Sequence, residues 1–392
     1  MDEITFSIFN HSPAASAQIT ALLKKFEHEE NIRVRIEVIP WNMGWQKLVE
    51  MGLYHIGADI SEIGSTWILD FVRMDVLRAY SLAEADEITN GQRYFDSTWT
   101  GGVSNTRTDR TIWGIPFAGD ARAVFYRKDW LEKAGIDEET AFKGPSRFDY
   151  TLAEIQKAGC SMPLSLPIGP SRNNIHILGS WIWGLGGEFL SADGNNIEFD
   201  HERALDGAKA YFGLGCYLGK EHMITEIDSD IAFHQGRSAV TISGYWILPV
   251  SKPAEVTSHM GVSPVPGVPF VGGEHLVIWK HSRRQEQALR LAKFLARPES
   301  SELLYPFFGL PVAIDGWNRA PFTEPNYQAF RNALQNGRSF PPGPLWGLVE
   351  KRLQDTLPEI WIEVLMHPER TDSIVENQLG ALAKHLQMTL KR

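Results

Sequence analysis

The stretch WGIPFAGDARAVFYRKDWLEKAGI, Trp113–Ile136, decides the fold of this chain. It begins as a strand through Pro116, and proline is tolerated in strands only at an edge, an end or a bulge. Asp120 and Arg122 interrupt the apolar run, which then resumes and enters a helix near Asp129. A strand that changes partners across a polar seam is expected where a chain leaves one lobe and starts another. The charged pair would then face a crevice between lobes, a common place for ligand sites. A hairpin with a surface salt bridge explains the same residues equally well.

The length and composition favour a globular protein with two lobes. A chain of 392 residues exceeds the usual size of a single hydrophobic core. A hydrophobic content of 43% and a charged content of 22% are ordinary for soluble proteins. The net charge of −10 argues against a nucleic-acid groove. Thirteen tryptophans stand out, because tryptophan is favoured at recognition surfaces as well as in cores.

The cysteines and the N-terminus exclude several classes of protein. Cys160 and Cys216 form no CxxC motif and no metal-ligand set, and they either pair in one disulfide or remain thiols. No run approaches the ~20 apolar residues of a membrane span. The chain enters a strand at once, with no basic or apolar leader before it. If the protein is exported, we expect that its signal segment has been removed.

The first 67 residues predict a parallel α/β arrangement. Hydrophobic periodicity predicts strands over 4–9, 34–39 and 59–63, and helices over 14–30 and 45–53. Connections of this length suit parallel crossovers, and ligands bind outside the carboxyl ends of such strands. Polar or aromatic residues follow all three strands: Asn10, His11 and Ser12, then Trp41 and Asn42, then Ser65, Thr66 and Trp67. The pattern therefore predicts a ligand site at this edge.

The rest of the chain predicts a second α/β region and a helical tail. We expect helices over 70–80, 151–158, 175–185, 203–213 and 285–296, strands over 164–168 and 238–242, and a hairpin over 186–199. The strand over 238–242 leads into Gly244, Tyr245 and Trp246. A Pro- and Gly-rich connection over 264–269 then suits a second crossing between lobes, and the residues from 326 onward are mostly helical.

Four ordered segments carry a family resemblance: LLKKFEHEENIRVRIEVI, WGIPFAGDARAVFYRKDWLEKAGI, FHQGRSAVTISGYWI and GGEHLVIWKHSRRQEQALRLAKFLARPESSELL. The chain resembles the extracellular solute-binding proteins of bacterial ABC importers, in the carbohydrate-binding branch that includes maltose-binding protein. The resemblance implies a two-lobed α/β periplasmic-binding-protein fold, each lobe a sheet flanked by helices, with crossing hinge segments and a helical C-terminal tail. We expect one lobe over 1–115 and 271–315 and the other over 116–270 and 316–392.

The resemblance also implies site residues where the motifs match. The loops Asn10–Ser12 and Ser65–Trp67 match polar sugar-binding loops. His176 falls where the family has a stacking or hydrogen-bonding residue. Trp246, next to Tyr245, and Trp346 match positions where aromatic side chains stack on sugar rings. Gly272, Gly273 and Glu274 match a cleft-lining segment.

The chemistry of a sugar site agrees with these positions. A sugar presents flat C–H faces edged by hydroxyls, so it needs aromatic platforms and hydrogen-bonding groups. The platforms would be Trp41, Trp67, Trp246 and Trp346, and the hydrogen-bonding groups Asn10, Asn42, Asp120, Arg122 and Glu274. Alternatives remain open at this point: Trp67 could open a core helix, Trp346 could pack the tail, and Asp120 with Arg122 could be a structural pair.

We therefore expect a binding protein and not an enzyme. It would bind a mono- or oligosaccharide or a sugar derivative between the lobes, close on it and deliver it to the permease of an ABC transporter. We expect a monomer, periplasmic or anchored at the cell surface, with no cofactor, metal or nucleic acid. A sensor domain is one alternative. A carbohydrate-active enzyme is another, with Asp120 and Glu274 as its carboxylate pair, although no HExxH, P-loop or G-x-S-x-G motif supports other chemistry.

Overall fold

The structure is a computed structural model, and it describes residues 2–105, 110–219, 225–248, 259–340 and 346–390. The chain divides into two compact units. Unit 1 comprises residues 1–120 and 271–324, and unit 2 comprises 121–270 and 325–392. The chain leaves unit 1 at the end of strand β7 (Ile115–Ala121) and re-enters it at strand β12 (Val271–Trp279). Both units have α/β architecture, as the sequence predicted.

Unit 1 is built on a mixed sheet with strand order β2-β1-β3-β12-β4, and β7 pairs with β12 off this path. The strands are β1 (Asp2–Phe9), β2 (Ile32–Ile39), β3 (Ile60–Gly64) and β4 (Leu77–Arg78). β1 is parallel to both β2 and β3, whereas β12 is antiparallel to β3. The crossovers are helices α1 (Pro13–Glu30) and α2 (Gly44–Tyr54). The predicted parallel crossovers are therefore present.

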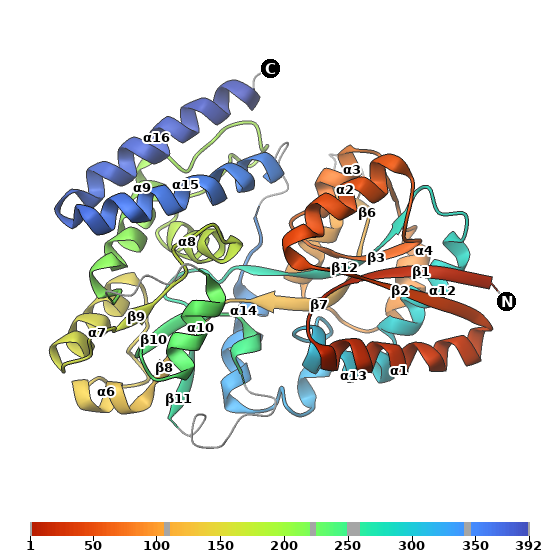
Figure 1. Cartoon of the computed structure of the whole chain (residues 1–392), viewed down its shortest axis with the longest axis horizontal. Coiled ribbons are helices and arrows are strands. Elements are labelled where there is room, and N and C mark those ends of the chain that lie inside the picture. The colour runs from red at the N-terminus through yellow and green to blue at the C-terminus, as the bar shows by residue number, and fades with distance from the viewer. Residues whose placement is uncertain (1, 106–109, 220–224, 249–258, 341–345, 391–392) are drawn as a thin grey trace. The chain divides into compact units, whose positions relative to one another are not determined.

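Apolar side chains cover both faces of this sheet. Along β12, Leu276 and Ile278 join one core cluster, while Val277 and Trp279 join the other. Helices α1, α12 (Gln285–Ala296) and α13 (Pro298–Phe308) pack on the first face, and α2 and α3 (Ile68–Arg73) pack on the second (Figure 1). Both faces of the sheet are therefore buried at β1 and β3, where even Ser7 and Ser61 are 0% exposed.

The predicted helix over 70–80 is wrong beyond Arg73. Helix α3 ends there, and Asp75 adopts a left-handed backbone with φ of 56°. The chain then becomes strand β4, in which Leu77 pairs with Trp279. Sheet pairing with β12 therefore overrides the helical spacing of this segment. Unit 1 continues through α4 (Leu82–Thr89), α5 (Asp96–Trp99), β5 (Val103–Asn105) and β6 (Arg110–Ile112).

Unit 2 contains a smaller sheet in the order β11-β8-β10-β9. These strands are β8 (Ala123–Arg127), β9 (Leu164–Ser165), β10 (Val240–Ser243) and β11 (Met260–Pro264). β8 is antiparallel to both neighbours, and β10 is parallel to β9. Around this sheet lie α6 (Lys128–Ala134), α7 (Pro145–Lys157), α10 (Glu226–His234) and α14 (Gln328–Asn336).

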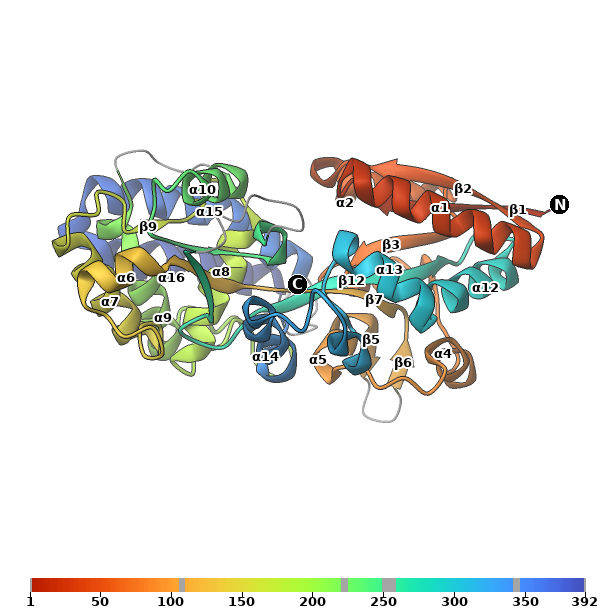
Figure 2. The same cartoon turned by 90° about the horizontal axis from the view of Figure 1, so that it is seen from below.

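A helical layer completes unit 2. It consists of α8 (Arg172–Gly184), α9 (Glu202–Gly213), α15 (Trp346–Met366) and α16 (Thr371–Leu390), which pack against one another (Figures 1 and 2). The predicted hairpin over 186–199 is reduced to a single bridge between Leu190 and Ile197. Cys160 and Cys216 are free thiols. In the described part of the chain, no helix has the length and apolar character needed to cross a membrane.

Candidate functional site

The carboxyl ends of β1, β2 and β3 bring the first predicted residues together in unit 1. The strands run in parallel register, so Phe9 lies opposite Ile39 at the shared edge. The amide of Asn10 donates to the carbonyl of Ile39 at 3.0 Å, which ties the two loops together. Asn10 and Asn42 are exposed at this edge. The predicted convergence of these loops is therefore a feature of unit 1 itself.

A buried carboxylate organises the start of this loop. Glu62, on β3, is 1% exposed. One of its oxygens accepts from the backbone amide of Phe9 at 2.9 Å, and the other bonds to Nε2 of His11 at 2.7 Å. Hydrogen bonds to an ionised group are among the stronger ones, so Glu62 fixes both the backbone and the imidazole of this loop. Ser12 has a separate local role, because its Oγ accepts from the amide of Ala15 and caps α1.

Trp41 is the exposed aromatic side chain of this edge. It lies in a short 3₁₀ turn after β2 (Trp41–Met43) and is 39% exposed. Its ring stacks on Phe9 with centroids 4.0 Å apart and an interplanar angle of 18°, and the ring of His11 stands perpendicular to it at 5.5 Å. Packing on one side and exposure on the other suit a flat recognition surface.

Trp67 requires a correction, because it does not present an open ring. It is 2% exposed, belongs to the core cluster beneath α2, and packs edge-on against Phe9 and Trp45. It immediately precedes α3, so the alternative of a core residue that opens a helix applies. Its neighbours Ser65 and Thr66 are buried and partly buried, and the amide of Ser65 donates to the carbonyl of Gly273 at 2.8 Å.

The glycines of β12 are explained by the neighbouring strand. Gly273 has φ of 134°, and a Cβ atom there would stand 2.2 Å from the carbonyl oxygen of Ala118 in β7. Gly272 is buried beside it, and Glu274 pairs with Gly64 on β3. The close approach of two backbones needs a glycine whether or not a ligand binds. The glycine signal is therefore no evidence for ligand contact.

The two residues of the polar seam belong to different units. Asp120 is the last residue of its segment in unit 1 and is partly exposed, whereas Arg122 belongs to unit 2 and is 4% exposed. The Nε of Arg122 donates to Oδ1 of Asn173, and Nη2 bonds to Nδ1 of His176 at 2.8 Å. Arg122 is therefore joined to the first turns of α8.

His176 is buried and held on two sides. Its ring stacks on Phe270 with centroids 3.7 Å apart and an interplanar angle of 8°. It is 7% exposed. Burial is the main cause that holds the pKa of His176 well below its usual range, and the charges of Arg122 and Arg172 act in the same direction. The imidazole is therefore neutral near pH 7.

Trp246 is the exposed aromatic side chain of unit 2. It lies in the 3₁₀ turn Tyr245–Ile247 after β10, is 42% exposed, and its ring folds back over Gly244, where a Cβ atom would stand 2.0 Å away. The guanidinium of Arg122 lies 4.9 Å from the ring centroid, a cation–π distance. Nε1 donates to Oδ2 of Asp230 at 2.9 Å. Tyr245 is partly exposed and packs edge-on against Trp246.

Asp230 is an unusual carboxylate next to this exposed ring. Burial raises its pKa to about 6, against the opposing effect of the hydrogen bond from Trp246. The side chain belongs to α10, and Glu226 on the same helix also raises the pKa. A carboxyl group with such a pKa changes charge close to neutral pH.

Trp346 also requires a correction. It is 4% exposed, and its ring stacks on Phe340 at 4.5 Å and meets Phe189 edge-on. These contacts place it in the core cluster of unit 2, where it opens α15. Trp346 packs the tail, which was the alternative that the sequence left open.

Sequence reasoning missed four residues of these clusters: Glu62, Asn173, Asp230 and Phe270. One signal was available, because Glu62 is a carboxylate between Ile60 and Ile63 in a segment that the sequence predicted as a strand. Such a residue is rarely buried without specific partners. Asn173 and Asp230 carry no comparable signal, since polar residues at helix starts and faces are ordinary. Phe270 carries none either, since phenylalanine is commonly buried in a core.

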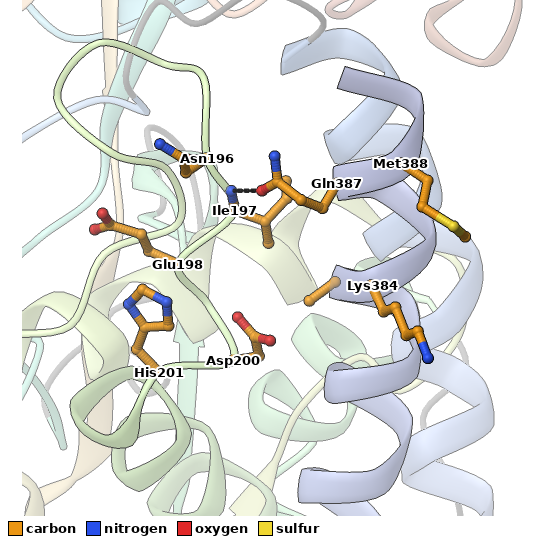
Figure 3. Close-up of a pocket in the computed structure, with 9 residues that line it drawn as sticks. Asn196, Ile197, Glu198, Asp200, His201, Lys384, Gln387 and Met388 are labelled. Atoms are coloured by element: carbon orange, nitrogen blue, oxygen red, sulfur yellow. Dashed lines mark hydrogen bonds between the residues drawn. The ribbon is translucent and has the colours of Figure 1, made fainter. Parts of the chain in front are cut away.

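A separate hollow of about 580 Å³ lies in unit 2 between residues 196–201 and helix α16 (Figure 3). Oε1 of Gln387 accepts from the amide of Ile197 at 2.7 Å and joins the two walls. None of the predicted site residues lines this hollow. Within the described residues, no group of three or more His, Cys, Asp or Glu side chains is arranged to hold a metal ion.

Comparison with known proteins gives a consistent family. The family model described as bacterial extracellular solute-binding protein matches residues 10–302. A binding protein from Brucella abortus (strain 2308) is 24% identical over 307 residues, which cover 75% of this chain and 72% of the relative.

Solved structures with the same fold include the sugar-binding protein MalE from Xanthomonas citri. It has 20% sequence identity and a TM-score of 0.82, with 99% of this chain and 97% of that chain covered. A solute-binding protein of an ABC transporter from Thermotoga lettingae, bound with alpha-D-tagatose, has 18% identity and a TM-score of 0.79, with 98% and 100% covered. UgpB from Mycobacterium tuberculosis, in complex with glycerophosphocholine, has 16% identity and a TM-score of 0.78, with both chains fully covered. These likenesses establish the two-lobed fold.

Proposed function

We propose, from the premise that this chain belongs to the bacterial extracellular solute-binding protein family, that it binds a carbohydrate or sugar derivative and delivers it to an ABC transporter permease. Proteins of this family bind small solutes outside the cytoplasm and interact with such permeases; they are binding proteins and not enzymes. The bound ligand would lie between the two units, which would close on it. The place of action would be the periplasm or the cell surface, and the working form a monomer.

The observation that carries this proposal is the pair of exposed tryptophans, one in each unit. Trp41 is 39% exposed and Trp246 is 42% exposed, and each has a packed face and a polar neighbour. A sugar ring needs an aromatic face together with hydrogen-bonding groups at its edge. Asn10, His11 and Asn42 would supply those groups in unit 1 and His176 in unit 2, while Tyr245 would extend the aromatic surface.

Ligand identity is open to a direct screen. Thermal denaturation of the purified chain would be followed with monosaccharides, oligosaccharides, polyols and sugar acids. A compound at 100 times its dissociation constant stabilises the folded state by about 2.7 kcal/mol, which is readily measured. We expect at least one carbohydrate to raise the midpoint. A complete panel without any shift would contradict the proposal.

Closure and the absence of turnover complete the proposal. Hinge closure around a ligand is established for periplasmic binding proteins, and the chain segments over 115–117 and 270–272 are the proposed hinges. Small-angle scattering should give a smaller radius of gyration with the sugar from the screen than without it. Mass analysis after incubation should return that sugar intact. Cleavage that disappears in Asp120→Asn or Glu274→Gln would instead indicate an enzyme.

A further inference from the structure

Helix α8 begins with two polar side chains, Asn173 and His176, and in each of them one polar atom has a hydrogen-bond partner and the other has none among the described residues. Asn173 is 2% exposed and His176 is 7% exposed. Within the described residues, neither Nδ2 of Asn173 nor Nε2 of His176 has a hydrogen-bond partner. Nearly all buried polar groups in proteins are paired, because an unpaired one loses its hydrogen bonds to water without replacement. The two atoms therefore mark a place where the fold tolerates an unfavourable arrangement.

The guanidinium of Arg122 determines what these two atoms are. A guanidinium has donors and no acceptor. Its bond from Nε must therefore end on the carbonyl oxygen of Asn173, which leaves the NH₂ group of that amide. Its bond from Nη2 must end on an unprotonated Nδ1 of His176, which leaves the proton on Nε2. Both remaining groups are hydrogen-bond donors.

Further contacts keep this arrangement in place. Asn173 and His176 are three residues apart and so share one face of α8. The ring of His176 lies flat on Phe270 at 3.7 Å. Burial and two nearby arginines lower the pKa of His176, so the imidazole keeps its single proton. The donors belong to the first turns of α8, where the helix dipole also favours negative charge. The side chain of Arg172, the first residue of α8, is 33% exposed, so this end of the helix reaches the surface.

Asn174 shows that unpaired donors are not a general property of this helix start. Its Oδ1 accepts from the hydroxyl of Tyr211 at 2.6 Å and from Nε1 of Trp361 at 3.1 Å. Its Nδ2 donates to the carbonyl of Gly169 at 3.1 Å. Both polar atoms of the Asn174 amide are thus hydrogen-bonded, and its oxygen joins α8 to α9 and α15. The two amides differ in their neighbours: that of Asn174 faces α9 and α15, and that of Asn173 faces Arg122.

We propose that Asn173 and His176 form a donor-only subsite that binds an oxygen acceptor of the solute, either a hydroxyl or a carboxylate, and rejects an ammonium group. This inference rests on the proposed function and deepens it. It also changes the role of Arg122, which becomes a positioning residue that orients the two donors. The sequence had suggested Arg122 as a ligand contact.

The first test is the protonation state of His176 and needs no solute. In protein labelled with ¹⁵N-histidine, long-range ¹H–¹⁵N spectra distinguish the two neutral tautomers and the imidazolium. We expect one neutral side chain with its proton on Nε2, whose signals disappear in His176→Phe. Arg122→Met, which removes the donor, should convert that signal to a mixture of tautomers. A proton on Nδ1 of His176, or an imidazolium at pH 7, in the wild-type chain would overturn the inference.

The second test uses three probes that differ at one substituent: D-glucose, D-glucuronate and D-glucosamine, each at millimolar concentration. In Asn173→Asp the side chain still accepts from Arg122, but an oxygen replaces the NH₂ donor. We expect binding of D-glucuronate to weaken at least tenfold and binding of D-glucose to weaken less. In the same variant, the affinity for D-glucosamine relative to that for D-glucose should rise at least tenfold. Asn332→Asp, at an exposed position on α14, is the matched control for added charge in unit 2.

The outcomes of this second test separate the subsite from the proposed function. Equal effects of Asn173→Asp and Asn332→Asp on all three probes would overturn the subsite. So would the lack of any response of the wild-type chain to the three probes. The proposed function is decided by the wider carbohydrate screen, and it survives either result if another sugar binds.

Discussion

The surroundings of Trp41 in unit 1 and of Trp246 in unit 2 differ in how completely their polar groups are paired. In unit 1 both oxygens of Glu62 are bonded, and Trp41 rests on the apolar ring of Phe9. In unit 2 Trp246 lies over a guanidinium, and two buried donors near that guanidinium have no partner among the described residues. The comparison suggests that the loop beside Trp41 is already paired at Glu62, while the surroundings of Trp246 keep hydrogen-bonding capacity for the solute.

The largest effect is expected from breaking the completed cluster of unit 1. Glu62→Ala leaves the amide of Phe9 and the imidazole of His11 without their acceptor, and it opens a cavity in β3. We expect a loss of about 3–5 kcal/mol in the free energy of unfolding, measured by urea denaturation. Glu3→Ala, an exposed carboxylate on β1 of the same sheet, should change it by less than about 0.5 kcal/mol. Similar values for the two variants would show that Glu62 does not organise this edge.

The next effect concerns a buried histidine of unit 1. His275 on β12 is 2% exposed, and burial lowers its pKa to about 4. The unfolded chain therefore binds the proton first as the pH falls, so this contribution to stability is complete above pH 6.5 and is lost between about 6.5 and 4. The loss should reach about 3 kcal/mol. Urea midpoints at several pH values should fall less steeply in His275→Leu. Parallel profiles for the two proteins would contradict the assignment.

An effect of opposite sign and slightly smaller size is expected in unit 2. The folded-state pKa of Asp230 is about 6, above its ordinary value of 3.8. The contribution of Asp230 to the free energy of unfolding is therefore fully present below pH 3.8, and it is lost as the pH rises from 3.8 through 6. Asp230→Asn keeps an acceptor for Trp246 and removes the buried charge. We expect this variant to be more stable than the wild type by about 3 kcal/mol at pH 7.5 and close to it at pH 4. A variant that is less stable at pH 7.5 would mean that the charge is needed.

The sequence could predict the elements but not which side of each tryptophan is covered. Strands β1 to β3 and their crossovers follow from hydrophobic periodicity, which is a local property. Trp41 and Trp67 both follow a strand, yet Trp41 is 39% exposed and Trp67 is 2% exposed. That difference depends on the packing of α2 and Trp45 from elsewhere in unit 1. The same reason applies to Trp346, whose ring is covered by Phe189 and Phe340.

Contacts between residues distant in sequence could not be predicted from the sequence either. Arg122 was singled out, but its bonds to Asn173 and His176 span 51 and 54 residues. The expectation that Gly273 lines a ligand cleft came from the family resemblance, whereas the backbone of β7 occupies the space beside it. Residue type indicates what a side chain is able to do, and only its neighbours determine what remains available.

The central claim is that one solute is bound by both units, and a titration of two variants tests it most directly. Calorimetry with the first carbohydrate from the screen would be performed on the wild type, Trp41→Ala and Trp246→Ala. Truncation of a central aromatic contact costs at least ~2 kcal/mol, or about thirtyfold in affinity. We expect one solute per chain and a loss of this size in each variant, with ligand-free unfolding midpoints nearly unchanged because both side chains are exposed. Wild-type affinity in either variant would contradict binding by both units.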